Sequence, residues 1–276
     1  MSATFQSYSH HGRTGYAVAD LPRDVLARLV ECPELPLQKE LPVTVKDGDG
    51  VLVCRTTLPL AERHLAVAYK RVHRKSRLKQ WTQAVGPNRA RRAFLTGHRL
   101  LERGIATARP LAVIVPSRFD LTAPTWLATE WLDGAEDLAA FARRSRQQAS
   151  DERTRINAVA VAVGRLIGMM HAAGIAHRDL KPQNLMVRCG ERPDAVELFA
   201  IDLDGVRFPG RLSEQRRWKN LSRLAIGDRG WPGLDLTVRC RYLGAYLDAA
   251  GLLMSRKQAW RELSRVTAAR LARRAA

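Results

Sequence analysis

The sequence contains no apolar run long enough to cross a membrane. A membrane-spanning helix needs roughly 18 or more predominantly apolar residues, whereas the longest runs here, Leu111–Pro116 and Ala158–Val163, are far shorter. The first residues, Met1 to Gln6, supply neither the basic nor the apolar region of a signal peptide. The sequence therefore predicts a cytoplasmic protein without a transmembrane segment.

Cysteine and aromatic residues are also scarce. The four cysteines form no C-x-x-C pair and show no metal-ligand spacing, so neither a zinc site nor a disulfide framework is indicated. Aromatic residues make up 6% of the chain and do not alternate with basic ones, as they would in a platform for single-stranded nucleic acid. Zinc-finger, RRM and KH signatures are absent too. Nucleic acid is therefore an unlikely partner on sequence grounds.

Acidic residues are few relative to basic ones. The chain has 27 Asp and Glu against 46 Lys and Arg, a net charge of +19. Residues 70–103 hold eleven basic residues against Glu102 alone, and the segment from Ser255 holds seven against Glu262. Such an excess favours a polyanionic partner, either an anionic membrane surface or a polyanionic substrate. A generally basic surface is the remaining alternative.

The overall composition is that of an ordinary globular protein. Of the 276 residues, 46% are hydrophobic and 26% are charged. A chain of this length buries a sizeable core and suits one two-lobed domain or two small domains.

A contiguous motif, His177–Asn184, carries the clearest chemical information. It reads H-R-D-L-K-P-Q-N and matches the catalytic loop H-R-D-x-x-x-x-N of protein-kinase-like enzymes at all four fixed positions. Asp179 would then accept the proton of the acceptor hydroxyl, and Lys181 would stabilise the transferring phosphoryl group. The apolar run Leu166–Ile175 before the motif is typical of a helix that leads into such a loop.

A second acidic element, Ile201–Gly205, begins soon after this loop. It reads I-D-L-D-G, and its Asp202 follows the apolar strand predicted at Leu198–Ile201. It matches the D-F-G element of kinases only at that aspartate and at the apolar residue after it. Mg²⁺ prefers oxygen ligands, which Asn184 and Asp202 can supply. The two motifs together predict phosphoryl transfer that depends on ATP and Mg²⁺.

Residues 42–54 have the pattern of a β-hairpin. Two β-branched runs flank the turn sequence Asp47-Gly48-Asp49-Gly50, and Asp-Gly in this position is a strong hairpin signal. Gly48 and Gly50 supply two of the three glycines of the G-x-G-x-x-G loop that covers the phosphates in kinases. We therefore expect these two glycines to contact the nucleotide, with the neighbouring aspartates directed away from it.

A third strand, His64–Lys70, ends in a basic residue. It resembles the V-A-I-K strand of kinases, in which the lysine holds the ATP phosphates; a surface lysine on a half-exposed strand is the alternative. The helix predicted over residues 87–104 should then carry its acidic partner. No acid lies between Glu62 and Glu102, so either Glu102 reaches Lys70 or ATP and the metal-binding aspartate alone hold it.

The remaining sheet residues lead into the second half of the chain. Strands are predicted at Leu111–Val115 and Trp126–Thr129. Glu130 and Leu132 then occupy the position of a kinase hinge, where backbone groups bond adenine. A long amphipathic helix, Asp151–Ala173, leads into the catalytic loop.

The predicted fold is α+β, a two-lobed protein-kinase-like fold. We expect an N-terminal extension over residues 1–38, a small antiparallel-sheet N-lobe over residues 39–132 and a mainly helical, shortened C-lobe over residues 133–276. Only 74 residues follow Asp202, and they contain no A-P-E element. This leaves little chain for a platform that binds protein substrates, and it favours a small or glycolipid acceptor.

Three further segments resemble the lipopolysaccharide kinase family, the Kdo and heptose kinases of the bacterial envelope. They are Gly104–Ala112, Arg217–Leu224 and Arg241–Leu247, and the resemblance extends over residues 40–270. It implies an ATP- and Mg²⁺-dependent phosphotransferase that acts on a sugar hydroxyl of a lipopolysaccharide core or a related glycolipid. It also implies a cytoplasmic protein, with peripheral attachment to the inner face of the inner membrane as an option.

Two alternatives stay open at this point. One is a protein Ser/Thr kinase, which would use a different hydroxyl-bearing acceptor. The other is a pseudokinase scaffold that binds a membrane or a partner through its basic surface. The missing helix acid supports the scaffold, whereas the presence of Asp179, Asn184 and Asp202 argues against it.

Overall fold

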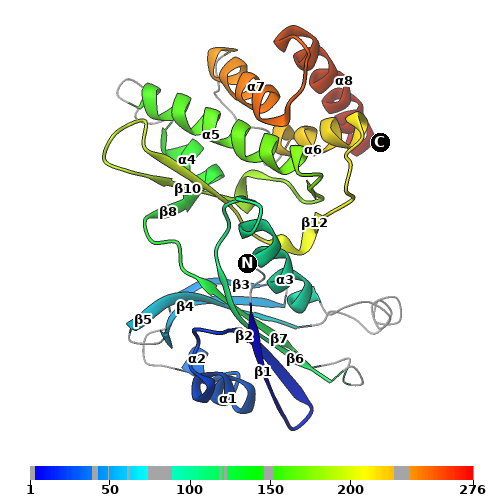
Figure 1. Cartoon of the computed structure of the whole chain (residues 1–276). Helices are drawn as coiled ribbons and strands as arrows, with labels where there is room; N and C mark the ends of the chain where they lie inside the picture. Colours follow the sequence, from blue (N-terminus) through cyan, green and yellow to red (C-terminus); the bar gives the residue numbers. More distant parts are fainter. Residues whose placement is uncertain are drawn as a thin grey trace. The chain divides into compact units, whose positions relative to one another are not determined.

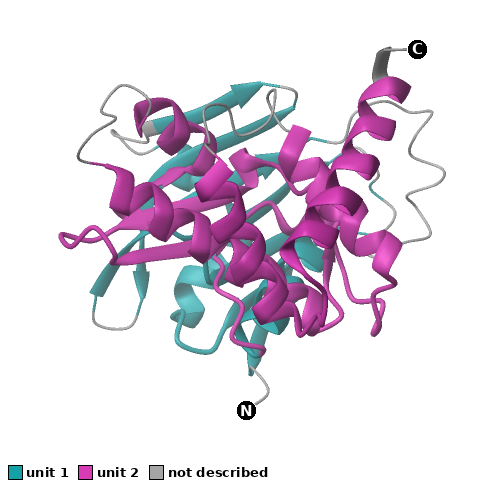
Figure 2. Ribbon diagram, turned by 90° about the horizontal axis from the view of Figure 1, so that it is seen from above, with its two compact units in different colours: residues 1–102, 108–131 teal, residues 103–107, 132–276 magenta. Residues whose placement is uncertain are grey.

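The chain divides into two compact units, which Figure 2 colours separately. Unit 1 consists of residues 1–102 and 108–131, and unit 2 of residues 103–107 and 132–276. The structure is a computed structural model, and it describes residues 4–38, 43–48, 50–60, 63–73, 89–117, 120, 123–145, 152–226 and 236–275.

Unit 1 is built on a seven-stranded antiparallel sheet with the strand order β1-β2-β6-β7-β5-β4-β3 (Figure 1). The hairpin predicted over residues 42–54 is confirmed, with Gly48 opposite Val51. The other three predicted strands are β5, β6 and β7. The strand bounds are β1 (Phe5–His10), β2 (Arg13–Val18), β3 (Val43–Gly48), β4 (Val51–Leu60), β5 (Arg63–Val72), β6 (Pro110–Pro116) and β7 (Thr125–Glu130).

Two of these strands come from residues 1–38, where the sequence indicated an extension with one helix. Strands β1 and β2 form a hairpin whose turn residues, His11 and Gly12, have φ values of 41° and 75°. Strand β2 pairs with β6, so this segment continues the sheet. The sequence of β1, FQSYSH, lacks the apolar alternation that identifies a strand.

The two faces of the sheet have separate apolar clusters. On one face, helix α1 (Arg23–Glu31) packs in a cluster that includes Val67 and Tyr69 of β5. On the other face, helix α3 (Arg89–Leu101) packs in a cluster with Leu127 of β7. Lys70 lies directly opposite Leu127 in the β5–β7 register, so it lies on the α3 face. A short helix, α2 (Leu35–Gln38), follows α1.

Unit 2 is mainly helical, and its β-structure is small. One sheet has the order β11-β10-β8, and a second consists of β12 and β9. The long helix predicted over residues 151–173 is α5. The bounds are β8 (Ala135–Asp137), α4 (Leu138–Ser145), α5 (Arg153–Ala172), β9 (Ala176–His177), η2 (Pro182–Asn184), β10 (Leu185–Cys189), β11 (Val196–Ala200), η3 (Leu203–Gly205), β12 (Val206–Arg207), α6 (Glu214–Ile226), α7 (Leu236–Ala250) and α8 (Arg256–Ala275).

Helices α5 and α7 approach each other closely because two glycines face the contact. A Cβ at Gly168 would lie 2.6 Å from the Cβ of Ala249 and 2.8 Å from the carbonyl oxygen of Tyr246. One at Gly164 would meet the carbonyl oxygen of Tyr242. The G-x-x-x-G spacing places both glycines on one face of α5, since residues four apart lie one above the other on a helix.

Some predicted features lie outside the described residues. They include Asp49 of the hairpin turn, residues 74–88 of the first basic segment and the first two residues of the helix predicted to begin at residue 87. The second basic segment is helix α8, whose Ala259 and Leu263 are buried. Over the described part of the chain, no helix combines the length and the apolar character that a membrane span requires.

Candidate active site

Backbone pairing joins the predicted catalytic loop to the chain that follows the predicted metal aspartate. In the two-stranded sheet of unit 2, His177 of β9 lies opposite Val206 of β12. The Arg178 N–H also donates to the carbonyl oxygen of Gly205, at 2.8 Å. A Cβ at Gly205 would lie 3.0 Å from Nδ1 of His177. This position therefore favours a residue without a side chain.

Asp179, Lys181 and Asn184 form a single polar cluster. Nδ2 of Asn184 donates to the backbone carbonyl of Asp179 at 2.8 Å and to Oδ2 of the same residue at 3.2 Å. Nζ of Lys181 lies 3.0 Å from that Oδ2. Asn184 is buried, whereas the Asp179 side chain is 57% exposed. A fixed amide thus orients a carboxylate that solvent or a substrate can reach.

His177 connects this loop to β11 as a neutral imidazole. Burial lowers its pKa, and this effect exceeds the opposing influence of the Ile201 carbonyl and of the nearby Asp202 and Asp179 charges. Nδ1 accepts the Asp179 N–H at 3.3 Å, and Nε2 lies 3.3 Å from the Ile201 carbonyl oxygen. A neutral ring meets both contacts when Nε2 carries the proton.

The two predicted metal ligands lie at the same end of the β10–β11 pair. Leu185 is opposite Ala200 in the antiparallel register, and the Ile201 N–H donates to the Asn184 carbonyl oxygen at 2.9 Å. Asp202 is the next residue and has φ 55° and ψ 58°. This left-handed conformation is more accessible to Asp and Asn than to most residues.

The donor set at this end fits Mg²⁺. Because Nδ2 of Asn184 is bonded to Asp179, the amide Oδ1 is left as its oxygen ligand. One carboxylate and one amide oxygen leave several positions for water and phosphate oxygens, as Mg²⁺ sites that bind nucleotides require. No group of three or more His, Cys, Asp or Glu that could hold a metal occurs among the residues that the structure describes. A dedicated all-protein metal cage is therefore not present there.

A buried polar network supports the loop from α6 and α7, and the sequence analysis did not identify it. Oδ1 of Asn220 accepts the His177 N–H at 2.9 Å. Nδ1 of His171 lies 3.0 Å from the hydroxyl of Tyr246. Burial first, and the Arg217 charge second, lower the pKa of His171 to about 4, against the opposing hydrogen bond with Asn220. The available signal was Asn220 itself, a polar residue on the apolar face of α6.

Arg223 interacts electrostatically with the predicted base and with two other arginines, and the sequence analysis did not identify it. Burial lowers the pKa of Arg223, and the charges of Arg270 and Arg178 lower it further, whereas Asp179 raises it. Helices α6 and α8, which carry Arg223 and Arg270, pack against each other. The Nε of Arg270 is buried and lacks a hydrogen-bond partner. A positive region therefore lies next to the carboxylate of Asp179.

The predicted nucleotide-binding residues of the sheet belong to unit 1. Lys70 is half-buried on β5, and Gly48 and Gly50 are exposed at the tip of the β3–β4 hairpin. The sequence of α3, RARRAFLTGHRLL, contains no acid. Glu102, the first acid after Glu62, is exposed just beyond the end of α3.

The predicted hinge residues lie where the chain leaves unit 1. The Glu130 N–H donates to the Arg109 carbonyl oxygen at 2.8 Å, and the Trp131 N–H donates to the Ala66 carbonyl oxygen at 2.9 Å. Leu132 begins the second segment of unit 2, and its carbonyl oxygen accepts the Ala135 N–H at 3.1 Å.

Comparisons with solved structures identify the fold. A structure of WaaP in complex with acyl carrier protein matches with a TM-score of 0.58 and 22% sequence identity, covering 86% of this chain and 88% of that chain. The BubR1 kinase domain matches with a TM-score of 0.41 and 12% identity, over 76% of this chain and 52% of that chain, and is too distant to support an argument. The match to WaaP confirms the predicted two-lobed, protein-kinase-like α+β fold.

Comparisons of sequence identify the family. No curated protein matches the chain. The sequence profile of the lipopolysaccharide kinase (Kdo/WaaP) family matches residues 53–237, which is more than half of the chain and includes both predicted catalytic motifs. With its kinase-like fold, the chain belongs to the lipopolysaccharide kinase (Kdo/WaaP) family.

Proposed function

We propose that this protein transfers the γ-phosphoryl group of ATP to a sugar hydroxyl of a lipopolysaccharide core or a related glycolipid. The observation that carries the proposal is the polar cluster of unit 2. It combines a reachable carboxylate on Asp179 with a buried amide on Asn184, which is bonded through its backbone to the residue before Asp202. This arrangement meets the positional demands of phosphoryl transfer.

The reaction follows from the atoms that the cluster offers. The acceptor hydroxyl gives its proton to a carboxylate oxygen of Asp179 while its oxygen forms a bond to the γ-phosphorus. The bond between that phosphorus and the β–γ bridging oxygen breaks, and ADP leaves. The Lys181 ammonium group, 3.0 Å from Oδ2 of Asp179, would stabilise the equatorial oxygens of the transferring group.

Mg²⁺, when bound, neutralises charge on the phosphate oxygens. Asn184 and Asp202 would hold it, and Lys70 is proposed to hold the ATP phosphates together with the backbone of Gly48 and Gly50. Glu130 and Leu132 are proposed to contact adenine through their backbone groups. The proposal assigns no acidic partner on α3 to Lys70, since that helix carries none.

The arginines next to Asp179 support an acceptor that is itself anionic. Burial lowers the pKa of Arg223, and the charges of Arg270 and Arg178 lower it further. Such a group of arginines is stabilised when a carboxylate or phosphate lies among its members, because guanidinium groups bind these anions in bidentate fashion. Core sugars bearing an acid or a phosphate near the reacting hydroxyl meet this requirement, whereas a neutral polypeptide hydroxyl does not.

The experiment uses purified protein with ATP, Mg²⁺ and lipopolysaccharide extracted from a strain that lacks the gene. We expect mass spectrometry to show one added phosphoryl group on the core, and the Asp179→Asn variant to add none. Phosphorylation of a generic protein with no change in the lipopolysaccharide would identify a protein kinase instead. Nucleotide binding without turnover on either acceptor would identify a pseudokinase scaffold.

A further inference from the structure

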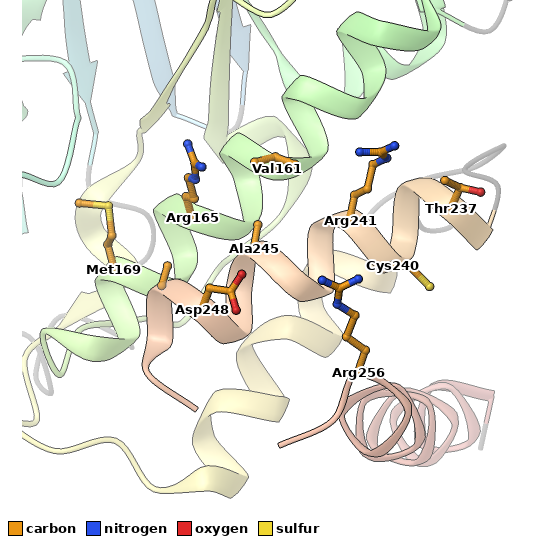
Figure 3. A pocket seen from close by; sticks show the side chains of 10 residues that line it. Val161, Arg165, Met169, Thr237, Cys240, Arg241, Ala245, Asp248 and Arg256 are labelled. Atoms are coloured by element: carbon orange, nitrogen blue, oxygen red, sulfur yellow. The ribbon is translucent and has the colours of Figure 1, made fainter. Parts of the chain in front are cut away.

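A groove of about 700 Å³ lies on the surface formed by α5, α7 and α8, and the proposed reaction does not use it (Figure 3). Its basic residues are Arg165 from α5, Arg241 from α7 and Arg256 from the start of α8. Apolar side chains, including Val161 and Met169, form part of its wall. The groove therefore combines three guanidinium groups, one from each helix, with an apolar lining.

The close contact between α5 and α7 places Arg165 and Arg241 along the same groove. Arg165 follows Gly164, the glycine that faces the backbone of Tyr242, and Arg241 precedes Tyr242. The guanidinium group of Arg256 lies over Gly244, where a Cβ would come within 2.8 Å of its Nε. Two glycines thus make room for the approach of α5 to α7 and of Arg256 to α7.

The groove carries an excess of positive charge, since three arginines and one acid, Asp248, line it. None of the ion pairs within the described part of the chain involves Arg165, Arg241 or Arg256. Asp248 also lines the groove but lies in no ion pair with them. Three guanidinium groups that line one concave surface attract an anion, and guanidinium groups match phosphate oxygens in charge and geometry.

Exposed apolar side chains occur on the same helices and on the connection between α7 and α8. Met169 in the groove wall is 42% exposed. Leu253, in the connection between α7 and α8, is fully exposed, and Leu236 at the start of α7 is 67% exposed. Trp260 of α8 packs under the guanidinium group of Arg239 and is 37% exposed. Exposed leucine and tryptophan side chains among basic residues are typical of a surface that lies in a membrane interface.

We propose that the α5–α7–α8 groove binds the phosphate-bearing headgroup of an anionic phospholipid and so attaches the protein to a membrane surface. The three arginines would contact the phosphate, and the apolar side chains would enter the headgroup region. A phospholipid explains both the basic residues and the apolar residues of this surface, whereas an acidic protein explains only the basic residues. The inference agrees with a glycolipid acceptor but does not depend on the proposed reaction.

The test compares vesicle binding of the full chain with that of two variants. The groove variant is Arg165→Gln, Arg241→Gln, Arg256→Gln. The matched control, Arg143→Gln, Arg211→Gln, Arg216→Gln, removes the same charge from exposed arginines outside the groove. Flotation is measured with vesicles of phosphatidylcholine alone and with added phosphatidylglycerol. Thermal melting of all three proteins confirms equal folding.

We expect the wild-type chain to float with the phosphatidylglycerol vesicles and not with phosphatidylcholine alone. The groove variant should bind these vesicles roughly tenfold or more weakly, since each basic residue near an anionic surface contributes about 1 kcal/mol, and the control should lose clearly less. Turnover of both variants on detergent-solubilised acceptor should equal that of the wild-type chain. This last measurement separates a failure of the groove proposal from a failure of the proposed reaction.

Three results would overturn the proposal. Equal losses in the groove variant and the control would show diffuse attraction by the net charge. Equal binding to both vesicle types would show that anionic headgroups are not recognised. Binding of polyglutamate that depends on the three arginines, without any vesicle binding, would identify an acidic protein as the occupant.

Discussion

The residues proposed for phosphoryl transfer and those proposed for nucleotide binding have different kinds of support. In unit 2, Asp179 and Asn184 belong to a network that continues through buried His177 and Asn220 into α6. In unit 1, Lys70 lies on a sheet face covered by a helix that contains no acid. The first region is fixed by side-chain hydrogen bonds, whereas the helix that covers the second region supplies no acid.

This difference shows where the demands on geometry are greatest. A base and two metal ligands must be placed accurately, because small displacements of reacting groups reduce rates strongly. A lysine that binds phosphate acts largely as a point charge and tolerates more freedom. The absence of an acid on α3 therefore does not argue against catalysis. It indicates that Lys70 is not controlled by a partner on that helix.

The largest loss of turnover is expected from a substitution at the predicted metal site. Asp202→Asn should lower turnover roughly a thousandfold or more, because several kcal/mol of charge stabilisation depend on a carboxylate that contacts the metal. Circular dichroism should show an unchanged fold. The matched control is Asp204→Asn in the short helix η3, which begins directly after Asp202. Turnover that survives in Asp202→Asn but disappears in Asp204→Asn would assign the metal to Asp204.

The next prediction tests the buried network of unit 2 through the pH dependence of the free energy of unfolding. His171 has a pKa of about 4 in the folded protein, below its ordinary value of 6.5. The unfolded chain therefore takes up a proton as the pH falls from 6.5 to 4 while folded His171 does not, and stability decreases by up to about 3 kcal/mol. Above pH 6.5 His171 is neutral in both the folded and the unfolded chain, so this loss of stability does not occur.

The measurement is urea unfolding of the wild-type chain and of His171→Asn at several pH values. Asparagine keeps a hydrogen-bonding atom near the Tyr246 hydroxyl but does not titrate in this range. The wild-type chain should lose more stability between pH 6.5 and 4 than the variant. Parallel pH profiles would show that His171 is not held neutral, and the proposed rigidity of this region would then lack support.

The sequence predicted the contiguous elements of the structure well. The polar cluster of residues 177–184 was recognisable because its residues lie within one eight-residue stretch, and the β3–β4 hairpin because Asp-Gly separates two β-branched runs. Helix α5 was identified by its apolar periodicity. In each case the information lies within a few neighbouring residues.

Features that depend on packing between distant segments were not predicted. Asn220 lies 43 residues after His177, and only the packing of α6 beside β9 brings the two together. Strands β1 and β2 were missed because their polar residues gain structure only by pairing along the edge of β6. The α5–α7–α8 groove depends on the approach at Gly164 and Gly168, and their G-x-x-x-G spacing was the signal available in the sequence.

A smaller effect is expected at the nucleotide lysine. Lys70→Met should lower kcat/KM for ATP roughly a hundredfold, about 2.7 kcal/mol, through loss of one positive charge at the phosphates. Replacement of Lys75 or Lys79, which follow this strand in the sequence, should change it much less. Equal effects at all three lysines would mean that this segment is a general polyanion surface, and that another residue holds the phosphates.

The smallest change in kcat/KM for ATP is expected for a substitution of Glu102. This variant tests whether Lys70 has an acidic partner, as the comparison of the two regions requires. Glu102 is the only acid between residues 63 and 119, and it lies exposed just after α3. If Glu102 is not a partner of Lys70, Glu102→Gln should change kcat/KM for ATP by less than about fivefold, since an exposed ion pair contributes roughly 0–1 kcal/mol. The matched control is Glu191→Gln, an exposed acid of unit 2. A loss in Glu102→Gln as large as that in Lys70→Met, with no further loss in the double variant, would show that the two residues act as a pair. The lysine would then be held as firmly as Asp179, and the contrast between the two regions would disappear.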